Sequence, residues 1–213
     1  MKWKDKLNLL LCIISDLQII HSQELIHRDL HCGNILLQES LSSAYIVDLG
    51  LSIHSNIVDK IGPEDIYGVL PYIAPEIFDK RPYTTASDIY SFGIIMWEIL
   101  YGKSVYYNKE FNQQLQIEIC CNNLRPSIIK DTPQCYINLM KECWEKCPEH
   151  RPTAEKIYDI FTKWNDDERI LLELSSSDNL LKDIENGHDQ IYNETKYCSR
   201  IYYSTSFILD AVK

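Results

Sequence analysis

The residues best suited to chemistry lie in two short polar segments near the start of the chain. The first, HRDLHCGN, occupies residues 27–34 and places Asn34 five residues after Asp29. The second, DLG, follows an apolar run and begins at Asp48. A carboxylate beside a hydroxyl can accept its proton, and carboxylate and amide oxygens are suitable ligands for Mg²⁺. Together the two segments indicate phosphoryl transfer.

The elements that must position these residues can be predicted from the flanking sequence. Residues 5–22 have apolar side chains at helical spacing and predict an amphipathic helix that leads into the first segment. ELIH and NILLQ predict short strands on either side of the loop, and SAYIVDLG predicts a strand that ends at the acid. Residues 51–74 have few periodic signals and predict a long loop, which inside a compact domain is usually functional.

The remainder of the chain is expected to be helical at first. Residues 85–102 are apolar on several faces and predict a buried helix that ends at Gly102. Thr85 or Ser87 can cap the start of this helix. Prolines separate three further predicted helices, near residues 109–120, 134–146 and 153–164.

Composition restricts the class of protein. The chain has 213 residues, of which 45% are hydrophobic, and this predicts one globular domain with some tail. A formal net charge of −10 argues against nucleic acid as a main partner, since phosphates favour basic proteins. Residues 165–213 hold 10 acids and 5 bases, and they predict an acidic tail that is helical at first and then flexible.

The eight cysteines and the lysine-rich, apolar start leave open a secreted, disulfide-bonded protein. We favour the amphipathic helix for this start because it leads directly into residues 27–34. No apolar run is long enough to cross a membrane, so we expect a cytoplasmic protein with reduced thiols. Cys143 and Cys147 could be a pair of zinc ligands, but no second pair completes a site, and small buried apolar residues are the favoured interpretation.

Five motifs occur in a characteristic order: HRDLHCGN, DLG, APE at 74–76, SDIYSFGIIMWE and CWEKCPEHRPT. This set resembles the C-terminal lobe of a eukaryotic protein kinase, over residues 1–164. The last two motifs are most similar to those of tyrosine-kinase-like kinases, fungal members in particular. The resemblance implies a mainly α fold, the helical large lobe of a kinase, with short β-strands around the catalytic loop.

The resemblance also implies roles for the residues of the first two motifs. Asp29 would accept the proton of a protein substrate's hydroxyl, with Arg28 beside it in the catalytic loop. Asn34 and Asp48 would hold Mg²⁺ on the phosphates of ATP, and Leu36 would lie under the adenine ring.

Five residues would support the site structurally. By resemblance, His27 and Leu49 would join a hydrophobic stack beneath it, and Asp88 would hydrogen-bond the backbone of the catalytic loop. Glu76 would form a desolvated ion pair with Arg151.

Regulation and specificity are less determined. Arg28 could bind a phosphate on the long loop, with Ser52, Ser55 and Tyr67 as candidate acceptors, although these are equally consistent with ordinary exposed hydroxyls. His31 replaces the lysine of many serine/threonine kinases, and as a titratable loop residue it would more often contact phosphate or solvent than accept a proton. Together with Val69, this residue leaves Ser/Thr against Tyr specificity open.

The nucleotide-covering small lobe has no counterpart in the sequence. None of the seven glycines has G-x-G-x-x-G spacing, and the 26 residues before His27 are too few for that lobe. We therefore expect an N-terminally truncated kinase with weak or no activity alone, and a partner that supplies or covers the small lobe. The alternative is a non-catalytic, kinase-like scaffold that binds partners in signalling.

Overall fold

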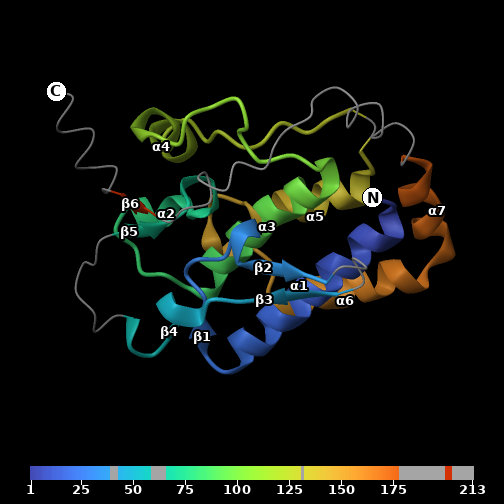
Figure 1. Cartoon of the computed structure of the whole chain (residues 1–213), viewed down its shortest axis with the longest axis horizontal. Helices are drawn as coiled ribbons and strands as arrows, with labels where there is room; N and C mark the ends of the chain where they lie inside the picture. Colours follow the sequence, from blue (N-terminus) through green and yellow to red (C-terminus); the bar gives the residue numbers. More distant parts are fainter. Residues whose placement is uncertain (39–42, 59–65, 131, 178–199, 203–213) are drawn as a thin grey trace.

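The computed structural model describes residues 1–38, 43–58, 66–130, 132–177 and 200–202. Its centre is the buried helix α3 (Thr85–Tyr101), which packs against α5 (Gln134–Cys143). Helix α1 (Trp3–Ser22) packs along α6 (Ala154–Asp166), and short strands lie on one flank of these helices (Figure 1). The predicted mainly α fold with short strands around residues 27–34 is confirmed.

Helix α1 begins two residues before the predicted start. Its inner face is almost fully buried, because Leu7, Leu10, Ile14 and Leu17 recur at helical spacing and expose no more than 2% of their surface. At its N-terminal end the ring of Trp3 lies 5.2 Å from that of Tyr136 on α5. Burial of this stripe holds the following residues 27–34 against the helical core.

Helix α3 begins at Thr85, as predicted, but its N-cap lies before both predicted caps, one residue before Thr85 and three before Ser87. Thr84 is the N-cap, and it forms a capping box with Ser87, whose hydroxyl accepts from the Thr84 N–H at 3.2 Å. Gly102 ends the helix as predicted, with a φ of 62° that glycine adopts without strain. Gly93 permits close packing, since a Cβ there would lie 2.8 Å from the Cβ of Cys143.

The other helices are short. The helices expected near residues 109–120, 134–146 and 153–164 are present as α4 (Gln113–Cys120), α5 and α6. Helix α4 begins later than predicted because Asn112 is its N-cap, and the Asn112 side chain accepts from the Leu115 N–H at 3.2 Å. The other α-helices of the described chain are α2 (Pro75–Phe78) and α7 (Glu168–Ser176).

Helix α7 belongs to the predicted acidic tail, yet it packs against α1. Leu174 is fully buried, and the Ser177 hydroxyl accepts from the Trp3 indole N–H at 2.7 Å. The predicted flexible part of the tail lies mostly outside the described residues.

The strands form three antiparallel pairs, β1 with β4, β2 with β3 and β5 with β6. The expected long loop at 51–74 therefore contains two strands, because main-chain groups of β4 pair with β1 and those of β5 with β6. Residues 59–65 of that loop lie outside the described residues. The strands are β1 (Leu25–Ile26), β2 (Ile35–Leu37), β3 (Ala44–Ile46), β4 (Ile53–His54), β5 (Ile66–Gly68) and β6 (Arg200–Tyr202).

A buried ion pair links α2 to the segment before α6. The Arg151 guanidinium donates to both carboxylate oxygens of Glu76, at 2.6 and 2.8 Å, and its Nε donates to the Glu145 carbonyl at 2.8 Å. Both residues expose only 5–6% of their surface. The bidentate geometry and the further carbonyl contact compensate for the desolvation of the two charges.

In the described residues, no helix is both long and apolar enough to span a bilayer.

Tyr90 on α3 lies between two arginines. The guanidinium carbons of Arg125 and Arg151 lie 5.3 and 5.2 Å from its ring centroid, which is cation–π geometry. Burial raises the pKa of its hydroxyl to about 12, although the two arginines act in the opposite direction. The buried hydroxyl oxygen has no hydrogen-bond partner in the described part of the chain. The ring therefore stabilises the fold, whereas the hydroxyl costs stability.

Replacement of Tyr90 should separate these two effects. Tyr90→Phe keeps the ring and removes the unsatisfied hydroxyl, so we expect the free energy of unfolding to rise by about 1 kcal/mol. Tyr90→Leu removes the ring and should lower that free energy by about 1–3 kcal/mol. Urea denaturation of the three chains measures both changes. A marked loss of stability in Tyr90→Phe would contradict the predicted cost of the hydroxyl.

Candidate active site

The carboxylate of Asp88 accepts hydrogen bonds from the backbone at the start of the segment 27–34. Asp88 lies in the first turn of α3 and exposes 1% of its surface. Its Oδ2 accepts from the His27 N–H at 2.8 Å and its Oδ1 from the Arg28 N–H at 3.0 Å. The His21 Nε2 lies 2.9 Å from the same Oδ2. The backbone at Arg28 has a left-handed φ of 72° and forms no strand. The Asp88 carboxylate supplies the hydrogen-bond acceptors that these two N–H groups need.

His27 is fully buried, and its two ring nitrogens determine its tautomer. Nδ1 accepts from the Asp29 N–H at 3.3 Å, and Nε2 lies 3.2 Å from the Val47 carbonyl oxygen. A carbonyl can only accept, so Nε2 carries the hydrogen and donates it. The imidazole thereby joins the catalytic loop to the residue that precedes Asp48.

Val47 also brings Asn34 and Asp48 together. Its N–H donates to the Asn34 carbonyl at 2.9 Å, which extends the β2–β3 pairing beyond the Ile35–Ile46 register. Asn34 and Asp48 therefore lie at the same end of this hairpin. Asp48 has a left-handed φ of 62°, and its Oδ1 accepts from the Gly50 N–H at 3.2 Å.

The amide of Asn34 is oriented by Asp29. Its Nδ2 donates to the Asp29 carbonyl at 2.8 Å and lies 3.5 Å from Asp29 Oδ2. The opposite orientation would place the amide oxygen against two acceptors, so Oδ1 must point away from Asp29. This oxygen and the exposed Asp48 carboxylate fit the preference of Mg²⁺ for a few protein oxygens together with phosphate.

His31 differs from the expected loop residue that contacts phosphate or solvent. It exposes only 4% of its surface, and its ring packs 5.9 Å from the ring of Tyr72. Nδ1 accepts from the Gly33 N–H at 3.0 Å, so Nε2 carries the hydrogen when the ring is neutral. Nε2 lies 3.7 Å from Asp29 Oδ2. A neutral His31 therefore presents a hydrogen towards Asp29 and does not accept a proton on that side.

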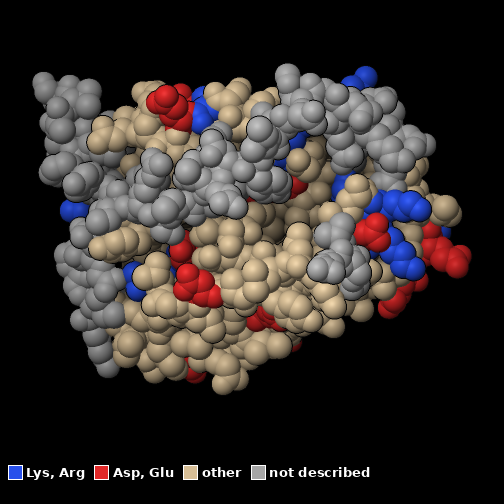
Figure 2. Space-filling view, in the orientation of Figure 1, with Lys and Arg blue, Asp and Glu red and all other residues tan. Residues whose placement is uncertain are grey.

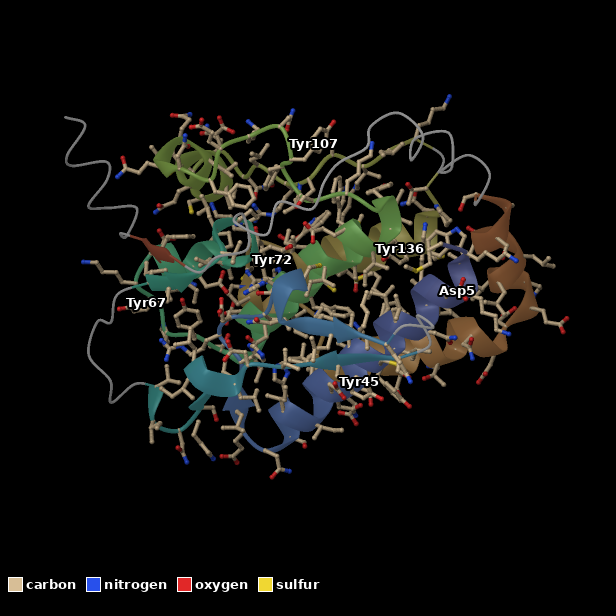
Figure 3. The ribbon with its side chains drawn as sticks, in the orientation of Figure 1. Asp5, Tyr45, Tyr67, Tyr72, Tyr107 and Tyr136 are labelled. Carbon is tan, nitrogen blue, oxygen red and sulfur yellow. The ribbon has the colours of Figure 1, made fainter. Side chains whose placement is uncertain are left out.

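The end of β5 lies beside Asp29. Gly68 has a φ of 140°, which disfavours a side chain, and a Cβ there would lie 3.6 Å from Asp29 Oδ1 and 3.1 Å from the Ile73 side chain. Val69 follows and is buried. The chain after β5 therefore forms one wall of the site, and Tyr72 from this segment points towards α3 (Figure 3).

The residues named for regulation lie in different environments. The Arg28 guanidinium lies 4.7 Å from the ring centroid of Tyr83, whose hydroxyl donates to the Tyr67 carbonyl at 3.2 Å. Tyr67 and Ser55 are exposed. Ser52 is not an exposed hydroxyl, because its oxygen is buried and has no hydrogen-bond partner among the described residues.

Leu36 and Leu49 lie on an exposed apolar surface. Leu49 exposes 49% of its surface, so the expectation that it joins His27 in a buried stack is wrong for this chain. The reason is that the described chain has no element above it. The exposed large apolar residues of this region, with exposed fractions of 38–58%, are Leu36, Leu37, Tyr45, Leu49 and Leu51. Few charged side chains interrupt the face that β2 and β3 present (Figure 2).

Sequence reasoning missed three contributors to the site: His21, the Val47 backbone and Glu98. Glu98 is buried on α3 and accepts from the Tyr72 hydroxyl and the Val105 N–H, both at 2.6 Å. Burial and the neighbouring Glu98 raise the pKa of the Cys32 thiol. An acid within the most apolar helix of the chain was the available signal for Glu98.

The chain belongs to the family described as protein tyrosine and serine/threonine kinase, whose family model matches residues 1–161. A relative from Dictyostelium discoideum, RGS domain-containing serine/threonine-protein kinase A, is 36% identical over 153 residues. An Arabidopsis thaliana protein, described as protein kinase and PP2C-like domain-containing protein, is 30% identical over 172 residues. The matches cover 71% and 66% of this chain, but only 13% and 26% of the two relatives.

The support that Asp88 gives to the loop can be tested by Asp88→Asn. An amide has one acceptor oxygen, so its NH₂ group would face a buried N–H of His27 or Arg28. We expect the free energy of unfolding to fall by about 2–3 kcal/mol, measured by urea denaturation. The matched control is Asp79→Asn, because Asp79 is exposed and should change stability by less than about 0.5 kcal/mol. Equal stability of the two variants would refute the role of Asp88.

Proposed function

We propose that this chain is the C-terminal lobe of a tyrosine-kinase-like protein kinase, which transfers the γ-phosphate of ATP to a hydroxyl of a protein substrate. The observation that carries the proposal is the convergence of Asp29, Asn34 and Asp48, through the Asn34 amide and the Val47 backbone. A structural loop has no need of an acid, an amide and a second acid at one hairpin end.

Asp29 is the proposed proton acceptor. Its carboxylate lies between the Asn34 amide, the His31 ring and the Gly68 backbone, and these three neighbours restrict the orientation of the carboxylate. Gly68 itself has no side chain beside the carboxylate, where a Cβ would lie 3.6 Å from Asp29 Oδ1. Asp29 would orient that hydroxyl and accept its proton as the phosphoryl group is transferred.

Asn34 and Asp48 are the proposed magnesium ligands. When bound, the metal neutralises negative charge on the phosphates. The Asn34 oxygen and the Asp48 carboxylate supply hard donors, and the Gly50 N–H orients the latter. Leu36 lies on β2, two residues after Asn34, and is 58% exposed, so it can contact the flat face of the adenine ring.

The exposed apolar surface around Leu36 and Leu49 is the proposed seat of a covering lobe, from the same protein or from a partner. Exposed large apolar side chains favour such a contact. The 213 residues contain no G-x-G-x-x-G spacing, so residues that clamp the phosphates would come from that cover. We expect weak transfer by the chain alone for this reason.

Serine and threonine are the proposed acceptors, because the Dictyostelium discoideum relative is described as a serine/threonine-protein kinase. Arg28 as a phosphate-binding residue, with Ser55 or Tyr67 as acceptors, stays a prediction, as does a cytoplasmic location. The scaffold alternative is not favoured, since the similar proteins are described as kinases.

Nucleotide binding tests the site directly. We expect the 213-residue chain to bind ATP in a Mg²⁺-dependent way, measured by isothermal titration calorimetry. Asp48→Asn should weaken binding by about tenfold in Mg²⁺, because it removes a charged ligand. Asp79→Asn is the matched control and should bind ATP like the unchanged chain. Binding that is equal with and without Mg²⁺, or equal in Asp48→Asn, would contradict the assignment.

Phosphoryl transfer tests the proton acceptor. With labelled ATP and a library of Ser, Thr and Tyr peptides, we expect slow transfer by the unchanged chain. Asp29→Asn should reduce the rate by about 10²–10⁴-fold and leave ATP affinity within a few-fold. Phosphopeptide mapping identifies the acceptor, and predominant labelling of tyrosine would overturn the Ser/Thr proposal. Undiminished transfer by Asp29→Asn would exclude Asp29 from catalysis.

A further inference from the structure

The chain's own C-terminal region supplies a strand to the substrate side of the site. Strand β6 pairs antiparallel with β5, and the register places Arg200 opposite Gly68, Ile201 opposite Tyr67 and Tyr202 opposite Ile66. More than 130 residues separate the two strands in the sequence. Figure 1 shows β6 in red alongside β5.

This pairing brings the tail close to the proposed proton acceptor. The Gly68 position lies beside Asp29, since a Cβ there would be 3.6 Å from Asp29 Oδ1. Paired Cα atoms of antiparallel strands lie about 4.5–5.5 Å apart, so the Arg200 backbone lies within roughly 10 Å of the Asp29 carboxylate. A strand in this position would lie where an extended peptide must pass to present a hydroxyl to Asp29.

We propose that β6 acts as a built-in pseudosubstrate, a strand that occupies the edge of β5 and excludes extended protein substrates from it. The identification of β5 as a substrate-binding edge rests on the proposed kinase function. Arg200 and Ile201 carry no hydroxyl, and Tyr202 pairs two residues farther from Gly68. Among the described residues of the tail, the one that pairs with Gly68 therefore offers no group to phosphorylate.

The chemistry of the edge defines the ligand that it accepts. Main-chain hydrogen bonds from an exposed strand edge bind an extended peptide with little dependence on its side chains. A ladder of three residue pairs is short and opens readily, so a substrate could replace β6. The occupant is this chain's own segment, and its displacement would expose the edge.

Two single proline substitutions provide a test with an internal control. Successive N–H groups of a strand point alternately towards and away from its partner. Of Arg200→Pro and Ile201→Pro, one must therefore remove a ladder hydrogen bond, whereas the other removes an N–H that faces away. The readout is NMR amide exchange of residues 66–68 in the complete 213-residue chain.

In the variant that loses the ladder hydrogen bond, the backbone amides of residues 66–68 should exchange their hydrogens about tenfold faster than in the unchanged chain. In the other variant the exchange rate should stay unchanged. A fluorescent peptide with the sequence SRIYYST, copied from residues 199–205, should bind the faster-exchanging variant several-fold more tightly than the unchanged chain. Equal urea midpoints would confirm that all three chains fold.

Identical amide exchange in the three chains, or equal peptide binding by them, would overturn the inference. Neither readout requires ATP. A chain that shows the expected exchange and peptide binding, but no Mg²⁺-dependent ATP binding, would contradict only the proposed kinase function.

Discussion

The structure of the site depends on one buried carboxylate, that of Asp88. The left-handed residue Arg28 turns the chain so that two consecutive N–H groups point into the protein, where no strand can accept them. A buried N–H without a partner costs about 1–3 kcal/mol, so a charged acceptor beneath both stabilises the turn strongly. Because Asp88 lies in the first turn of α3, the helix N-terminus also favours its negative charge.

A second constraint transmits this order to the proposed metal ligands. The His27 ring donates to the Val47 carbonyl, while the Val47 N–H donates to Asn34. The turn set by Asp88 therefore positions His27, and His27 positions the residue before Asp48. The acid, the amide and the second acid come from different elements, yet they share one hydrogen-bonded backbone framework. This framework would keep the site preorganised before any nucleotide binds.

The arrangement around Asp29 also connects the proposed site with the tail. Gly68 lies beside the carboxylate, and the strand that ends at Gly68 pairs with β6 along its edge. An open edge that binds peptides would also promote association between chains, and a short internal strand protects it. Occupation by the tail would thus serve both regulation and solubility.

Helical periodicity and ordered motifs made the helices around the core and the site residues predictable, because both are properties of local spacing. The sequence by itself determined that α1, α3 and α6 would be helices, and it grouped Asp29, Asn34 and Asp48 as candidates for one site. It did not predict the strands at 53–54 and 66–68 or the burial of His31. Only the tertiary structure decided these, since each depends on partners distant in sequence: β1 and β6 for the two strands, and Tyr72 for His31.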